Sequence, residues 1–99
     1  MQTQGMLKEN ALAGRTIVVT GGGTGLGYSM SKYFLELGAN VVITSRKMEV
    51  LTESAEKLRQ ETKNENVFPL NCDVRKYEEI EALLKASIEK FGKVDGLVN

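Results

Sequence analysis

The sequence predicts an α/β fold in which one parallel sheet is covered by helices on both faces. Three observations predict it. Short runs rich in β-branched residues alternate with segments of helical period in the order βαβαβαβ. The connections between these segments are short, and a glycine-rich stretch separates the first strand from the first helix. Such an alternation requires crossover connections, and therefore a doubly wound parallel sheet.

The first half of the chain contains two strands with a helix between them. We expect the first strand over residues 15–20 and the helix over 25–37, where Gly38 ends it. A second strand is expected over 41–44, because a continuous β-branched run suits a strand buried on both faces. The apolar positions of the helix are spaced by four, four and three residues, and they are Leu26, Met30, Phe34 and Leu37.

The second half predicts helices over 48–62 and 77–91 and a third strand over 67–70, and a fourth strand begins at Gly96. Pro69 cannot donate to a ladder, so the third strand belongs at the edge, in the strand order 3-2-1-4. Right-handed crossovers place the first two helices on one face and the third on the other. The predicted inward positions of the last two helices are Leu51, Ala55 and Leu58, then Ile80, Leu83, Leu84, Ser87, Ile88 and Phe91.

We expect residues 1–14 to form an N-terminal arm and residues 15–99 to belong to a single domain. The fourth strand would leave its outer edge unpaired, and an exposed edge of this kind is an aggregation hazard. The sequence therefore predicts the N-terminal part of a longer chain, with the sheet truncated after strand four.

Composition excludes several classes of function. The 99 residues carry 13 basic and 13 acidic side chains, interspersed, so no basic surface for nucleic acid is expected. No apolar run approaches the length of a membrane span, and the polar start lacks the apolar core of a secretory signal. The single cysteine, Cys72, excludes an internal disulfide and favours a reducing compartment. We expect a cytoplasmic protein with no metal site.

The glycine-rich stretch predicts a phosphate-binding corner. Its residues are Gly21, Gly22, Gly23, Thr24, Gly25, Leu26 and Gly27. Glycine allows a tight turn and close approach of the backbone to a ligand, and the following helix presents unpaired N–H groups and a positive dipole end. We interpret it as a site for the pyrophosphate of a dinucleotide. A tight turn without a ligand is the alternative, and a nucleoside-triphosphatase loop is disfavoured because Tyr28 replaces the required lysine.

The end of the second strand predicts which dinucleotide is bound. NAD-binding folds usually place an acid there to bond the ribose 2′-OH. This chain has Ser45, Arg46 and Lys47 instead. A hydroxyl and a guanidinium can bind a 2′-phosphate that a carboxylate would repel, which favours NADP(H). Alternatively, Arg46 and Lys47 are ordinary solvated residues and Ser45 only caps the next helix.

Asp73 follows the third strand, at the same edge of the sheet. Its carboxylate is placed to accept the amino group of an adenine. The alternative is an Asx turn leading into the last helix. The residues alone leave both possibilities open.

Taken together, three segments resemble the N-terminal half of a short-chain dehydrogenase/reductase, and hence a Rossmann-type domain. They are Thr20–Gly27, Cys72-Asp73-Val74 and Asp95–Asn99. A narrower likeness to the 2,4-dienoyl-CoA reductases rests on 21–27, on Ser45-Arg46-Lys47 with Val50-Leu51, and on Cys72–Arg75. The resemblance implies that Gly21 to Gly27 hold the pyrophosphate, Arg46 the 2′-phosphate and Asp73-Val74 the adenine, with Asn99 near the cofactor. At position 76 this chain has a lysine, whereas the family often has an acid shortly after the Asp-Val pair.

The resemblance also implies a reaction. The parent protein would transfer a hydride from NADPH to an enoyl- or dienoyl-CoA thioester in fatty acid metabolism, as a homo-oligomer. The family's catalytic tyrosine and lysine follow the segment that begins at Asn99, so this chain is expected to contain no catalytic residue and to be inactive alone. Alternatives are a short-chain reductase of ketones or alcohols and a non-catalytic NADP-binding sensor. A methyltransferase is disfavoured, because it generally needs an acid where Ser45-Arg46 stands.

Overall fold

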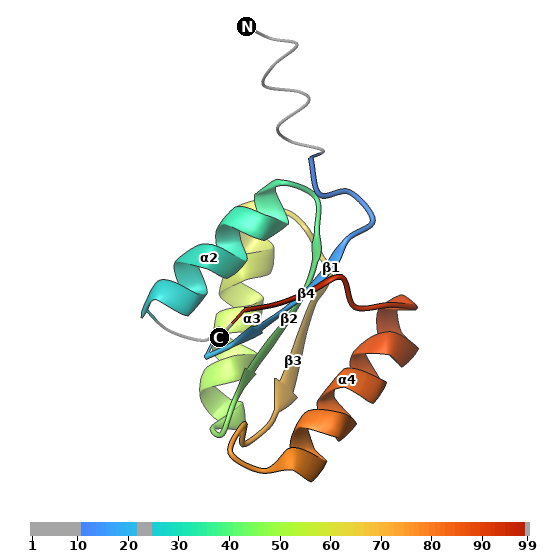
Figure 1. The fold of residues 1–99 in the computed structure, drawn as a ribbon. Coiled ribbons are helices and arrows are strands. Elements are labelled where there is room, and N and C mark those ends of the chain that lie inside the picture. Colours follow the sequence, from blue (N-terminus) through green and yellow to red (C-terminus); the bar gives the residue numbers. More distant parts are fainter. Residues whose placement is uncertain (1–10, 22–24, 99) are drawn as a thin grey trace, which may run out of the picture.

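The computed structural model describes residues 11–21 and 25–98 and contains a four-stranded parallel sheet (Figure 1). The strand order is β3-β2-β1-β4, which confirms the predicted order 3-2-1-4. The strands are β1 (Thr16–Thr20), β2 (Asn40–Ser45), β3 (Val67–Asn71) and β4 (Gly96–Val98).

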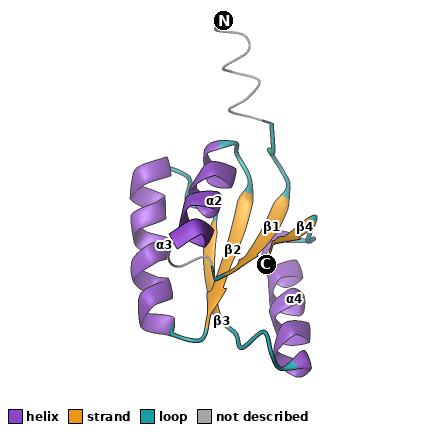
Figure 2. Ribbon diagram, turned by 60° about the vertical axis from the view of Figure 1, so that its left-hand side comes forward, coloured by secondary structure: helices purple, strands orange, loops and turns teal. Residues whose placement is uncertain are grey.

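The helices form a layer on each side of the sheet. They are α2 (Gly25–Glu36), α3 (Met48–Thr62) and α4 (Tyr77–Phe91). Figure 2 shows α2 and α3 on one face and α4 on the other, as right-handed crossovers require. The predicted bounds of α3 and α4 are confirmed, and α2 ends one residue earlier than predicted.

Each face of the sheet has its own core, because successive strand residues point to opposite sides. On β1, Ile17 and Val19 face α2 and α3, whereas Val18 faces α4. The larger core lies under two helices and includes the three predicted inward residues of α3, Leu51, Ala55 and Leu58, all fully buried. The smaller core lies under α4 and comprises Val18, Val42, Cys72 and Leu83, with Phe68, Leu70, Phe91 and Val94 packed against it.

The predicted inward face of α2 is partly wrong. Leu26 is 76% exposed, and the buried residues of the helix are Ser31 and Leu35. Ser31 is accommodated because its Oγ donates a hydrogen bond to the carbonyl of Gly27 at 2.8 Å, within the helix. A pattern of apolar residues cannot identify a buried serine of this kind. Phe34, also expected to face inward, does pack against the core, although it is only partly buried.

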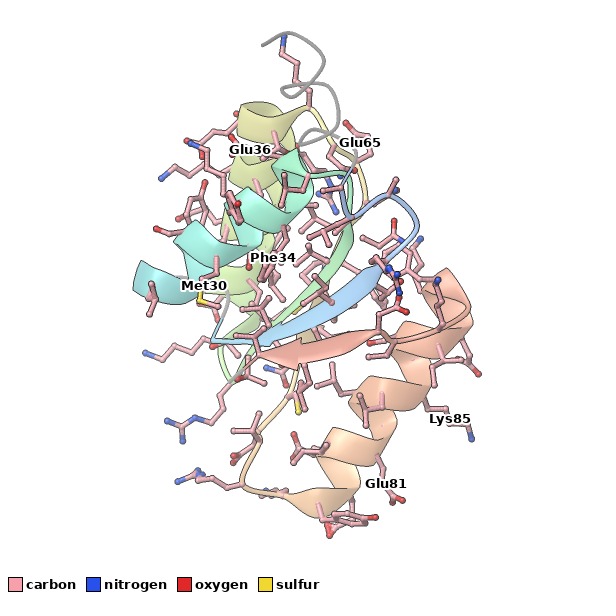
Figure 3. All side chains as sticks on the ribbon, turned by 45° about the horizontal axis from the view of Figure 1, so that its top comes forward. Met30, Phe34, Glu36, Glu65, Glu81 and Lys85 are labelled. Carbon is pink, nitrogen blue, oxygen red and sulfur yellow. The ribbon has the colours of Figure 1, made fainter. Side chains whose placement is uncertain are left out.

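The face under α4 is less completely covered. Leu83 and Ser87 are buried as predicted, but Ile88 is 48% exposed. Figure 3 shows Glu81 and Lys85 projecting from the side of α4 that faces away from the sheet. The period of the helix therefore predicts a wider apolar stripe than the sheet covers.

Pro69 occupies an outward-facing position of β3. At one end of this strand Asn66 accepts a hydrogen bond from the Val41 N–H, and at the other the Cys72 N–H donates to Ser45, each at 2.9 Å. Because ladder bonds alternate along a strand, the residue at position 69 directs its nitrogen away from β2. This position tolerates proline, as predicted for an edge strand.

Asn64 joins three segments at the opposite end of the sheet. Its Nδ2 donates to the carbonyl of Leu35 at 3.1 Å and to that of Ala39 at 3.0 Å. Its Oδ1 accepts from the backbone N–H of Asn66 at 2.9 Å. One side chain therefore fixes the end of α2, the approach to β2 and the loop before β3.

Within the described residues, no helix combines the length and apolar character needed to cross a membrane. The same part of the chain contains no group of three His, Cys, Asp or Glu side chains arranged to hold a metal ion.

Candidate functional site

A pocket of about 340 Å³ lies at the carboxyl ends of β1, β2 and β3. Parallel strands bring their carboxyl ends to one edge of the sheet, and ligands of open α/β sheets bind in the crevice there. Five of the predicted site residues line this pocket: Gly21, Ser45, Arg46, Asp73 and Val74. Its other lining residues are Thr20, Thr44, Cys72 and Arg75.

Gly21 forms the corner where β1 leaves the sheet. Its φ of +70° is in the left-handed region that favours glycine, and its N–H donates to the carbonyl of Thr44 at 2.7 Å. Among the described residues nothing lies within 4 Å of a Cβ placed on Gly21, so backbone conformation rather than crowding requires glycine. Gly21 itself lines the pocket.

The remaining residues of the glycine-rich stretch divide into two groups. Gly25, Leu26 and Gly27 form the first turn of α2 and are not among the residues that line the pocket. Gly22, Gly23 and Thr24, together with Asn99, lie outside the described residues.

The loop after β2 is held from β3. Asn71 Nδ2 donates to the carbonyls of Ser45 and Arg46 at 3.3 and 2.7 Å. The Cys72 N–H also donates to the Ser45 carbonyl, at 2.9 Å. The backbone of Arg46 is thereby fixed while its side chain stays exposed at the pocket.

Ser45 does not cap α3 in the usual way. Its Oγ accepts the N–H of Lys47 at 3.3 Å, which orders the turn before the helix. Lys47 is itself the N-cap and its side chain forms no capping hydrogen bond. Lys47 is not among the pocket-lining residues, whereas Ser45 and Arg46 are.

Asp73 accepts a dense set of hydrogen bonds from Arg75. Oδ1 accepts the backbone N–H and the Nε–H of Arg75, and Oδ2 accepts from Nη2, each at 3.0 Å. The bonds from the Arg75 side chain, followed by its backbone N–H, hold the pKa of Asp73 well below its usual range. The Asx-turn alternative is therefore present in the structure. It does not exclude ligand binding, because an ionised carboxylate offers about four lone-pair sites.

The floor of the pocket contains two buried groups, Thr44 and Cys72. Thr44 Oγ1 has no partner in hydrogen-bonding geometry within the described chain. The thiol of Cys72 has its pKa raised by burial and lowered to a smaller extent by the Thr44 hydroxyl beside it.

Four residues of this region were not among the predicted site residues, although two of them, Thr20 and Arg75, lie in the motifs that carry the resemblance. Thr20, Thr44 and Asn71 each lie at or next to the last position of a strand, a placement that could have marked them. Arg75 could have been found from its spacing, because the residue two positions after an aspartate donates its N–H in an Asx turn.

The pocket thus combines a glycine corner at Gly21, an exposed guanidinium at Arg46 and a carboxylate at Asp73, groups that can bind a nucleotide. The sequence model described as short chain dehydrogenase matches residues 15–99. The chain belongs to the short chain dehydrogenase family. Family membership confirms the resemblance inferred from the glycine turn and the Asp73-Val74 pair.

Curated relatives include several 2,4-dienoyl-CoA reductases. The peroxisomal enzyme of Arabidopsis thaliana is 35% identical over 92 residues, which are 93% of this chain and 30% of the relative. A probable 2,4-dienoyl-CoA reductase of Caenorhabditis elegans is 37% identical over 95 residues, covering 95% and 30% of the two chains. The chain thus spans about a third of the length of these relatives.

Among solved structures, a citronellol catabolism dehydrogenase of Pseudomonas aeruginosa PAO1 superposes with a TM-score of 0.85 at 33% identity. The match covers 91% of this chain and 37% of that protein. It confirms the doubly wound parallel sheet as the fold of this chain.

Proposed function

We propose that this chain is the NADP(H)-binding part of an oxidoreductase that reduces an enoyl- or dienoyl-CoA. The observation that carries the proposal is the chemistry of the pocket rim after β2. Ser45 and Arg46 stand there, at the edge of the sheet where NAD-binding folds usually present a carboxylate to the ribose. A guanidinium forms charge-assisted, bidentate hydrogen bonds with a phosphate, and a carboxylate would repel it.

In this proposal, each part of the dinucleotide has its own residues. Arg46 binds the 2′-phosphate with Ser45 and Lys47, and Asp73 and Val74 bind the adenine. We propose that Asn99 also belongs to the cofactor site. The pyrophosphate is held by Gly21, Gly22, Gly23, Thr24, Gly25, Leu26 and Gly27. When bound, the nicotinamide supplies the hydride, and the contribution of these residues is to hold and orient the nucleotide.

The substrate assignment is supported by the relatives named 2,4-dienoyl-CoA reductase. We propose an acyl-CoA thioester of fatty acid metabolism as the substrate, a homo-oligomeric full-length protein and a cytoplasmic location, although the Arabidopsis relative is described as peroxisomal. We also propose that residues 1–14 form an arm, that 15–99 carry the cofactor half of one domain, and that residues 1–99 alone catalyse no reduction.

The cofactor proposal is tested by titrating the full-length protein with NADPH and NADH, following nucleotide fluorescence. Arg46→Ala is expected to lower the affinity for NADPH by about tenfold or more and to leave NADH binding nearly unchanged, because hydrogen bonds to charged groups contribute about 1.5–3 kcal/mol. Lys85→Ala is the matched control, since it removes a positive charge from the outer side of α4 (Figure 3). An unchanged preference in Arg46→Ala would refute the role of Arg46.

A second candidate is a short-chain enzyme acting on a ketone or alcohol. It is favoured by the similarity to the citronellol catabolism dehydrogenase, at 33% identity. The two candidates are separated by assaying the full-length protein with NADPH and either a 2,4-dienoyl-CoA or a panel of ketones, following the ultraviolet absorbance of NADPH. Oxidation of NADPH by ketones alone would overturn the thioester assignment, and nucleotide binding without turnover of any substrate would favour the sensor alternative.

A further inference from the structure

We propose that Arg75 is a specificity-determining residue whose guanidinium neutralises Asp73, so that the pocket accepts a nucleotide with a 2′-phosphate. This inference rests on the proposed function, because it concerns the same nucleotide in the same pocket. It assigns to Arg75 an indirect action through Asp73, distinct from the direct phosphate contact proposed for Arg46.

The pocket contains one side chain that attracts a phosphate and one that repels it. Arg46 and Asp73 both line it. A phosphate dianion is attracted by the first and repelled by the second. A pocket that binds the phosphorylated nucleotide must therefore compensate the charge of this carboxylate.

Arg75 is placed to compensate the charge of Asp73. Its guanidinium meets both carboxylate oxygens of Asp73, with Nε–Oδ1 and Nη2–Oδ2 distances of 3.0 Å. The Asp73 side chain is only 13% exposed, whereas that of Arg75 is 71% exposed and lies at the rim. Among the described residues, Arg75 is the cation that forms an ion pair with Asp73.

Glu79, the acid that contacts the backbone of Asp73, has a cation of its own. Glu79 accepts the Asp73 N–H at 2.7 Å through Oε1, and its Oε2 lies 3.8 Å from Lys76 Nζ. Lys76 therefore offsets Glu79, and Arg75 is the ion-pair partner of Asp73. Without Arg75, the other cation whose charge acts on Asp73 is Arg46, which would then have to offset this carboxylate and bind the phosphate as well.

The expected effect follows from Coulomb's law. A unit charge acting through a largely aqueous dielectric on a doubly charged phosphate about 6–8 Å away changes affinity by a factor of about five to ten. A nucleotide lacking the 2′-phosphate carries no charge at that point. Loss of Arg75 should therefore lower the ratio of NADPH to NADH affinity, whereas a purely structural role would weaken both nucleotides equally.

The test measures this ratio in the full-length protein and its variants. Arg75→Ala is expected to lower the ratio about five- to tenfold, and Arg75→Lys is expected to retain most of it, because the charge remains. Adding Asp73→Asn to Arg75→Ala should restore the ratio, since no carboxylate then needs compensation. If Arg75→Ala does not fold, as judged by circular dichroism, Arg75→Gln replaces it, because glutamine can still donate to Asp73 without a charge.

Three outcomes would overturn the inference: an unchanged ratio in Arg75→Ala, an equal loss for both nucleotides, or no recovery in the double variant. Each leaves the NADP(H) proposal intact provided the unmodified protein prefers NADPH. An unmodified protein without that preference would overturn both proposals together.

Discussion

Replacing Asn64 by alanine is expected to lower the free energy of unfolding by about 2–3 kcal/mol. The side chain donates to the carbonyls of Leu35 and Ala39 and accepts the N–H of Asn66, at distances of 2.9–3.1 Å. A net contribution of about 1 kcal/mol for each of these three hydrogen bonds gives the upper figure, and access of water to the vacated groups gives the lower. The loss is large for a half-buried polar residue because one side chain joins three segments.

The assay is urea unfolding of the full-length protein followed by circular dichroism, with a common slope for all variants. Asn66→Ala is the control, since the structure describes hydrogen bonds only of its backbone. Asn64→Asp should be more destabilising than Asn64→Ala, because an oxygen would replace the donor that faces the carbonyls of Leu35 and Ala39. A loss below about 0.5 kcal/mol in Asn64→Ala, the range of ordinary surface changes, would refute the reasoning.

Three further predictions concern other parts of the fold. Tyr28→Phe removes the 2.6 Å hydrogen bond that Tyr28 donates to Glu61, and is expected to cost about 1 kcal/mol in urea unfolding. Burial, and then Glu61, raises the pKa of Tyr28 to about 12, so the stability linked to its protonated form should be complete below pH 10.0 and lost as the pH rises through about 12. Gly21→Ala should cost about 1–2 kcal/mol because of its positive φ, whereas Gly96→Ala, where a Cβ would lie 3.9 Å from its neighbour, should be nearly neutral. Asp95→Asn should flatten the dependence of stability on pH below about 4. In the folded protein the pKa of Asp95 is lowered by a backbone hydrogen bond from Thr16 and then by nearby cations. The stability that the ionised carboxylate provides is therefore lost as the pH falls through the pKa of the folded state.

Each of these predictions has a contrary outcome. Ionisation of Tyr28 at pH 10.0, seen in its ultraviolet absorbance, would contradict the raised pKa. Equal stability losses in the two glycine variants would show that conformation is not the reason for Gly21. An unaltered acid unfolding curve in Asp95→Asn would show that this carboxylate is not linked to folding.

Much of the fold could be predicted from local signals. Continuous β-branched runs predict β1 and β2, and Gly92, which has a φ of +89°, marks the end of α4. Pro69 identified the edge strand and with it the strand order. The inward face of α2 could not be predicted, because Ser31 is buried through a hydrogen bond that depends on helix geometry and not on hydrophobicity.

The site was predictable where a residue lies at, or one or two positions after, the carboxyl end of a strand. Ser45, Arg46 and Asp73 meet at the pocket because parallel strands end at one edge of the sheet. Asn71 was missed because its partners are carbonyl groups 25 and 26 residues away, and no local pattern records such a contact. The sequence predicts Thr44 only as part of a buried strand, because a β-branched residue within such a run is typical of the core.

Pro69 reduces the number of main-chain hydrogen bonds that the outer side of β3 can offer to another strand. On the outer side of β3, position 69 presents a ring where any other residue would present an amide hydrogen. A foreign strand aligned there would lose one of its main-chain bonds and would meet the ring in the plane of the ladder. Fibril-like stacking from this side is therefore discouraged by a single residue, without any charged side chain being placed in the strand.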